Sequence, residues 1–118
     1  SIIKSSIVLS DGVNSAANAK RIPGAIIRYC FTVDNTGIGN ADNATVNDSL
    51  TGTGKDNLTY VKSGSVVQDI ATACDCAALN TTNGSISGTN VTINMGTLTG
   101  TNATSTSRGC AYIEMTIQ

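Results

Sequence analysis

Residues 26–34 read IIRYCFTVD, and the alternation within this stretch decides the expected fold. One set of alternate positions is apolar or aromatic: Ile27, Tyr29, Phe31 and Val33. The intervening positions carry Arg28, Cys30, Thr32 and Asp34. Successive side chains of a β-strand point to opposite faces of the sheet, so this pattern predicts a strand with one buried and one solvated face.

The same period of two recurs on both sides of this stretch. We expect further strands at residues 2–10, 43–50, 58–63, 64–70, 90–98 and 110–118, with a break at Ser63-Gly64 separating two of them. The one helix-compatible stretch, residues 14–21, is short and is followed by Pro23. The chain is therefore predicted to be all-β, an immunoglobulin-like antiparallel β-sandwich of about seven strands in one domain over residues 1–118.

Composition removes several classes of function. Charged residues make up 13% of the 118 residues and the net charge is −1, which gives no basis for a nucleic-acid or membrane partner. The chain has no histidine, so the usual general base and imidazole metal ligand are missing. No run of about 20 apolar residues predicts a membrane span. We expect a protein that is not an enzyme, with no catalytic residues, cofactor or metal.

Four cysteines, Cys30, Cys74, Cys76 and Cys110, indicate disulfides and a secreted or cell-surface protein. A zinc site is disfavoured because the close pair has C-x-C spacing and no second close pair exists. Cysteines two residues apart seldom bond each other, so Cys74 and Cys76 are each expected to reach Cys30 or Cys110. The sequence leaves both orders open. Because Cys30 falls on the outward face of its strand, its partner is expected in a surface loop.

Several motifs together resemble a bacterial surface repeat, the conserved domain of unknown function 11. They are IPGA at 22–25, YCFTVDNTGIGN at 29–40, the Asn-rich strand ending in DSL at 48–50, LTYVKSGS at 58–65 and GTLTG at 96–100. The resemblance covers the whole chain and implies an extracellular immunoglobulin-like module of adhesins and surface assemblies, without enzymatic activity. Members of that family usually occur as tandem modules in long chains.

The N-terminal strand carries the main functional hypothesis. Residues 1–10 form the most apolar terminal segment, and residues 11–24 are expected to be a connector without strong structure. A strand on a long tether can pair within its own sheet or be donated to a neighbouring subunit. We predict a homopolymeric subunit of a bacterial extracellular filament or surface assembly, with assembly mediated by the apolar residues Ile2, Ile3, Ile7, Val8 and Leu9.

The alternative is a monomeric adhesive or carbohydrate-binding module with its site in residues 35–43 or 99–107. Aromatic side chains for stacking on a sugar are scarce, and Tyr60 and Tyr112 are the candidates. A calcium site at the acidic and amide residues of 34–48 is disfavoured, because their spacing lacks a regular ligand pattern. A Lys4–Glu114 cross-link is disfavoured for want of an adjacent Asn.

Asn-x-Ser/Thr sequons raise the prospect of surface glycans. They begin at Asn43, Asn47, Asn57, Asn80, Asn83, Asn90 and Asn102. In a bacterial protein, a composition rich in Asn and Thr accounts for them more simply.

Overall fold

A computed structural model describes residues 1–52 and 57–118 of the chain. Its strands are β1 (Ile2–Ser10), β2 (Ile26–Asp34), β3 (Ala41–Ser49), β4 (Leu58–Asp69), β5 (Gly84–Ser87), β6 (Asn90–Leu98) and β7 (Ser107–Ile117). Two short 3₁₀ turns, η1 (Ala16–Asn18) and η2 (Cys76–Ala78), lie in the connections. The expected all-β class is confirmed.

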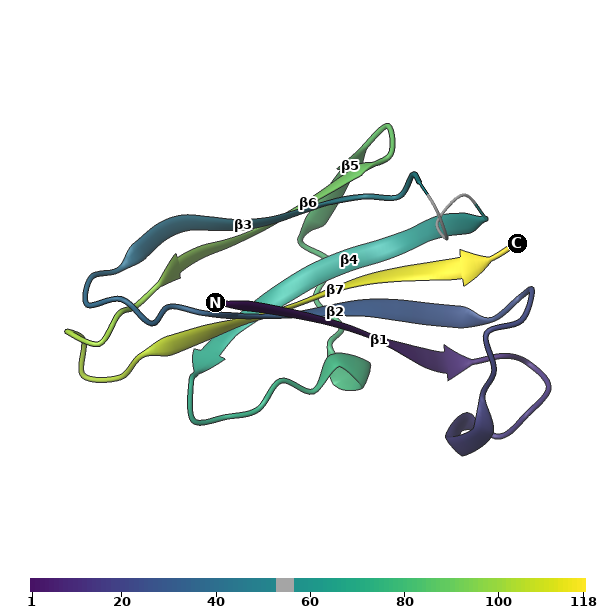
Figure 1. Cartoon of the computed structure of the whole chain (residues 1–118), viewed down its shortest axis with the longest axis horizontal. Coiled ribbons are helices and arrows are strands. Elements are labelled where there is room, and N and C mark those ends of the chain that lie inside the picture. Colours follow the sequence, from purple (N-terminus) through teal and green to yellow (C-terminus); the bar gives the residue numbers. More distant parts are fainter. Residues whose placement is uncertain (53–56) are drawn as a thin grey trace.

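The strands form two antiparallel sheets that pack as a sandwich (Figure 1). One sheet has the order β1-β2-β7-β4 and the other β3-β6-β5. An immunoglobulin constant domain is divided in the same way into four and three strands, but its fifth strand lies between the second and fourth. Here β7 takes that place and β5 lies beside β6. The turn at Gly88-Thr89 joins β5 directly to β6, which keeps the two strands in one sheet.

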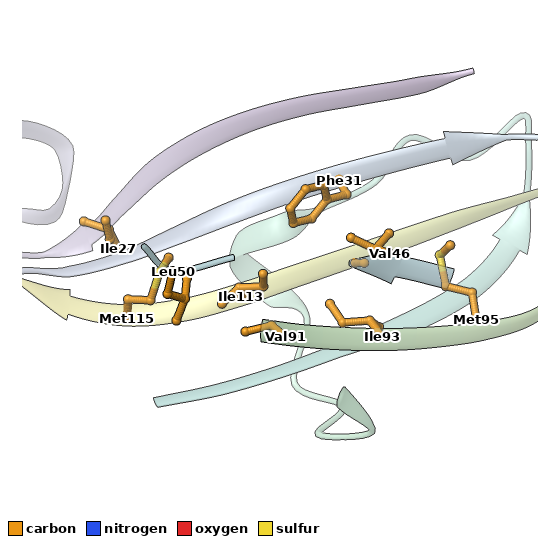
Figure 2. Close-up of a cluster of buried hydrophobic side chains, with 10 residues drawn as sticks. Ile27, Phe31, Val46, Leu50, Val91, Ile93, Met95, Ile113 and Met115 are labelled. Atoms are coloured by element: carbon orange, nitrogen blue, oxygen red, sulfur yellow. The ribbon is translucent and has the colours of Figure 1, made fainter. Parts of the chain in front are cut away.

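The hydrophobic core lies between the sheets (Figure 2). Its buried members come from β2, β6 and β7 and from β3 with the residue after it: Ile27, Phe31, Val46, Leu50, Val91, Ile93, Met95, Ala111, Ile113 and Met115. Small branched side chains suit this space because they fit the pleated inner faces. The predicted inward face of residues 26–34 is confirmed, with Phe31 buried and Tyr29 and Val33 packing at the margin of the core.

The expected break at Ser63-Gly64 is wrong, because residues 58–69 form one strand of 12 residues. Gly64 does not form a turn; a glycine is needed there because another segment of the chain passes close to it. The Thr81 carbonyl lies against Gly64, where a Cβ would overlap it. The local irregularity of β4 is instead a register shift between Tyr60 and Lys62. Strand β5 was not predicted. The expected and observed numbers of strands agree because β4 was expected as two strands.

The outer face of the four-stranded sheet is covered, although its polar residues predicted a solvated surface. Tyr112 is fully buried, and Arg28 and Glu114 are 4% and 8% exposed. The cover is the connection between β4 and β5, which holds η2 below the sheet in Figure 1, opposite the three-stranded sheet. Tyr112 is therefore unavailable for stacking on a sugar.

Candidate functional site

Strand β1 is the element for which self-assembly was predicted, and it lies at the edge of the four-stranded sheet. It pairs with β2 from Ile2 opposite Val33 to Ser10 opposite Ile26, with an irregularity between Val8 and Ser10. Ile3 pairs with Thr32 and Ile7 with Arg28, so both belong to the outer face of the sheet, and Leu9 lies at the irregularity.

The inward positions of β1 contribute little to the core. Val8 packs against the core cluster without being fully buried. Ile7 and Leu9 are half-buried, whereas Ile2 and Ile3 are 61% and 62% exposed. The buried cluster contains no residue of β1. The edge strand is thus held mainly by its backbone ladder, and two large apolar side chains at its start remain open to solvent.

Lys4, a residue of β1, connects the two sheets at this side of the sandwich. Its side chain points inward, with Nζ 4.5 Å from the centre of the Tyr29 ring and 5.5 Å from that of Phe31. The same Nζ lies 3.1 Å from Oδ2 of Asp48 on β3, so the contact joins the edges of the two sheets. Glu114, the partner considered for a cross-link, binds Arg28 instead. An inward-pointing charge on an edge strand also opposes unspecific strand addition.

The opposite edge of this sheet is obstructed by the chain itself. The backbone N–H of Ser65 on β4 donates to Oδ1 of Asn83 at 2.7 Å. The backbone oxygen of Ser65 accepts a hydrogen bond from Oγ1 of Thr81 at 2.9 Å. The middle of the β4 edge therefore has its backbone groups occupied by the segment that runs to β5. A further strand could pair with the middle of β4 only by displacing this segment.

The connector after β1 has no strand and contains only the short turn η1, and its loop is ordered around one carboxylate. Asp11 is 4% exposed. Its Oδ1 accepts the N–H groups of Val13 and Asn14 at 2.8 and 2.6 Å, and its Oδ2 accepts Nδ2 of Asn14 and the N–H of Lys20 at 2.6 and 2.8 Å. These bonds fold residues 11–20 into a loop that returns the chain toward β2. Asp11 consequently sets the path that leads β1 into its own sheet.

Disulfides and an ion pair hold the cover over the outer face of the four-stranded sheet. Cys30 is joined to Cys76 and Cys74 to Cys110, which is one of the two pairings left open by the sequence. Beneath the cover, Nε of Arg28 donates to Oε1 of Glu114 at 3.0 Å. The guanidinium also donates to the backbone oxygens of Cys76 and Leu79 at 2.6 and 2.7 Å. The cover is thus attached to the sheet by two disulfides and by hydrogen bonds from the buried Arg28 guanidinium.

Tyr112 completes this layer. The Arg28 guanidinium lies 4.1 Å from the centre of its ring, and its hydroxyl donates to the Thr81 backbone oxygen at 2.7 Å. Burial raises the pKa of the Tyr112 hydroxyl above its ordinary value. Sequence reasoning missed this layer, since Arg28, Tyr112 and Glu114 alternate like solvated residues. The one available signal was that Cys30 and Cys110 lie on the same face.

The loops of the alternative carbohydrate site meet at one end of the sandwich and bind each other. Thr101 N–H donates to the Gly37 oxygen, and Asn102 N–H donates to the Ile38 oxygen, both at 3.0 Å. Gly100 N–H donates to Oδ1 of Asn40 at 3.2 Å. Many polar groups of residues 35–40 and 99–107 are therefore used inside the protein, and Tyr60 lies far along β4 from this end.

The residues considered for calcium are likewise engaged separately. Asp34 binds Arg108, Asp42 accepts from Thr97 and Asp48 binds Lys4. Within residues 1–52 and 57–118, no three His, Cys, Asp or Glu side chains come together as a metal site. In the same part of the chain, no helix has the length and apolar character to cross a membrane.

A pocket of about 410 Å³ lies where β3 ends and β4 begins. Its lining is apolar or hydroxyl-bearing and contains no charged side chain among the described residues: Leu50, Thr51, Leu58, Thr59, Tyr60, Ile86, Gly88 and Thr89. Among these lining residues, no basic or acidic side chain lies beside the Thr and Tyr hydroxyls to activate them.

We expect the stability of the domain to fall in acid and in alkali. The hydrogen bonds to Asp11 and the Arg108 guanidinium beside Asp34 hold both carboxyl pKa values below the ordinary 3.8. Their contribution is complete above pH 4 and is lost as pH falls through the lowered pKa values. Tyr112 has a raised pKa, so its contribution is complete below pH 10 and is lost above it.

Urea unfolding followed by circular dichroism across pH 2–11 would measure this profile. Asp11→Asn should flatten the acid limb while lowering stability at pH 7, because a neutral amide cannot accept all four hydrogen bonds. A variant with the acid dependence of the parent chain would contradict the role of Asp11.

Comparisons with family models, curated proteins and solved structures give no match to this chain. The resemblance to the surface repeat therefore stays a prediction.

Proposed function

We propose that this chain is a structural subunit of a bacterial extracellular filament or surface assembly, and that subunits associate by exchanging β1. The observation that carries the proposal is the contrast within β1 itself. The strand makes a ladder with β2 over nine residues but adds no side chain to the buried core. A neighbour's β1 could replace it without disturbing the packing between the sheets.

The free energy of strand exchange differs from that of inserting a donated strand into an empty groove. An exchanged β1 would remake the same ladder in trans, so the core contacts largely cancel between the two states. The balance then depends on the connector and on new contacts between subunits. Ile2 and Ile3, which are mostly exposed in one chain, would gain cover from the next subunit, at roughly 1.5–3 kcal/mol for each side chain that becomes fully buried.

The geometry of exchange favours a polymer. Each chain offers one donor strand and one acceptor edge along β2, and these are different surfaces. A contact between unlike surfaces propagates from subunit to subunit unless it closes into a ring. The occupied edge of β4 restricts this pairing to the β1 side of the four-stranded sheet. An extracellular location agrees with the two disulfides.

Cross-linking would show whether β1 pairs in cis or in trans. Ile3 and Thr32 are register partners, so Ile3→Cys with Thr32→Cys places a cysteine on each strand. In assembled protein, we expect a ladder of covalent oligomers on a non-reducing gel, with Ile3→Cys alone as the matched control. A double variant that gives monomers alone would refute donation.

Electron microscopy of the purified chain with and without residues 1–10 provides the second test. We expect filaments from the intact chain and their loss on truncation, with recovery when a peptide of residues 1–10 is added. Monodisperse monomers from the intact chain would instead support the adhesive module. Because the peptide tests whether the truncated chain keeps an open acceptor edge, misfolding and loss of the donor can be told apart.

A further inference from the structure

The asparagines of this chain fall into two groups that differ in both sequence and structure. Seven of the 12 begin an Asn-x-Ser/Thr sequon. Ser and Thr together make up 29 of the 118 residues, so a random arrangement would place one of them two positions after about three of the asparagines. The composition rich in Asn and Thr, which the sequence alone favours as the simpler explanation, therefore accounts for fewer than half of the sequons.

The five asparagines outside sequons all hold the fold together. Asn14 donates to Asp11, Asn18 to Ser15, and Asn35 to the backbone oxygens of Gly39 and Leu98. Asn40 accepts from the Gly100 N–H, and Asn94 accepts from the Gly96 N–H. Each of these side chains has a structural reason for being an asparagine.

The seven sequon asparagines are all exposed, and most have no such reason. Within the described residues, no side-chain hydrogen bond is found for Asn43, Asn57, Asn80, Asn90 or Asn102. The positive φ of Asn43, 53°, suits asparagine but does not engage its amide. The Oδ1 of Asn47 accepts from Thr92 at 3.0 Å, which leaves its Nδ2 without a partner in the described part of the chain. Asn83 is the exception, since its Oδ1 accepts from Ser65 N–H and its Nδ2 approaches Ser65 Oγ at 3.4 Å.

The outer face of the three-stranded sheet also carries exposed sequon asparagines among uncharged polar residues. Strand register places the sequon residues Asn47 and Asn90 on this face, opposite Thr92 and Ser49. Their neighbours on the face are also uncharged and polar: Thr45, Ser85, Ser87 and Asn94. These residues leave an open hydrophilic surface on which an attached sugar meets no apolar patch.

We propose that Asn43, Asn47, Asn57, Asn80, Asn90 and Asn102 are N-glycosylation sites and that Asn83 stays unmodified. The co-substrate is an oligosaccharide carried on a lipid pyrophosphate, used by a separate transferase. The Asn Nδ2 bonds to the anomeric carbon of the sugar, the bond from that carbon to the pyrophosphate oxygen breaks, and one amide proton is lost to a base. The free lipid pyrophosphate leaves. This inference does not depend on strand exchange.

Asn80 and Asn83 provide an internal comparison, because they lie three residues apart in the same segment. A sugar on Asn80 would extend from an exposed amide into solvent. Asn83 is held on the β4 edge by its Oδ1, and a sugar on its Nδ2 would have to fit beside Ser65 Oγ, which lies 3.4 Å from this nitrogen. Both asparagines are exposed in the same segment, so we attribute a difference in occupancy to the hydrogen bonds of Asn83.

Glycopeptide mass spectrometry of the protein purified from its own source tests the proposal. We expect glycan masses on the six named asparagines and none on Asn83 or on the five asparagines outside sequons. A chain that is bare at all six sites would overturn it. Occupancy of Asn83 equal to that of Asn80 would overturn the structural division between them.

Two matched variants sharpen the test in a secretory host that attaches N-glycans. Thr82→Ala removes the Asn80 sequon, and Ser85→Ala removes the Asn83 sequon, while both asparagines are kept. Thr82 and Ser85 are exposed, so neither change should disturb folding. We expect Thr82→Ala to lose the mass of one glycan and Ser85→Ala to lose none; the reverse result, or loss in neither, would contradict the assignment.

Discussion

Glu114→Ala is expected to lower the free energy of unfolding by about 3–5 kcal/mol, because it leaves a buried guanidinium without its counter-charge. Arg28 would keep its hydrogen bonds to the Cys76 and Leu79 oxygens, but neither carbonyl carries a full charge. With Arg28 only 4% exposed beneath the cover, water cannot replace the carboxylate without moving the chain above it. Urea unfolding with both disulfides intact would measure the loss.

The control is the double variant Arg28→Met with Glu114→Leu. Replacing a buried ion pair by apolar side chains of similar volume is often close to neutral, because the cost of removing both charges from water disappears. We expect the double variant to recover most of the stability lost by Glu114→Ala. A double variant as unstable as the single one would show that shape at these positions matters more than charge.

Gly64→Ala is expected to cost about 3 kcal/mol, since the added methyl group would overlap the Thr81 carbonyl. The colliding atoms are backbone, so the segment before β5 must shift away from the β4 edge. That shift would also release the hydrogen bonds of Ser65 to Asn83 and Thr81. Faster hydrogen exchange at the Ser65 amide, beyond that of its neighbours, would identify this local displacement.

Gly39→Ala serves as the matched control in a loop of the same domain. A Cβ at Gly39 meets nothing within 4 Å, and its φ does not require glycine. We expect a change within about 0.5 kcal/mol. Equal costs for the two substitutions would mean that the close approach at Gly64 does not constrain the fold. A β4 edge freed by Gly64→Ala would also offer a second place for strand addition.

The two proposals assign different surfaces of the sandwich to different tasks. Strand exchange uses the β1 edge of the four-stranded sheet, whereas two of the glycan sites lie on the outer face of the other sheet. Sugars on Asn47 and Asn90 would keep that face turned to solvent in an assembly. Failure of either proposal leaves the other standing, since one depends on backbone pairing and the other on free side-chain amides.

The sequence alone determined the class of the fold and its inner face. Alternation in residues 26–34 identified Phe31 as core, and the spacing of four cysteines predicted two disulfides that reach across the chain. The inner face follows from a local property, because the side chains of a strand alternate with a period of two. The disulfides follow from elimination, because cysteines so close in sequence rarely bond each other. The lack of histidine likewise disfavours the common designs of an enzyme active site.

Only the tertiary structure decided which polar residues are buried and which edge is open. Arg28, Tyr112 and Glu114 alternate like solvent-facing residues, and their burial depends on a cover that comes from a separate stretch of chain. Gly64 resembles a turn residue until Thr81 is placed against it. The face on which β1 packs depends on register with β2, and a shift of one residue would reverse it. These outcomes depend on contacts between distant segments, which local patterns do not encode.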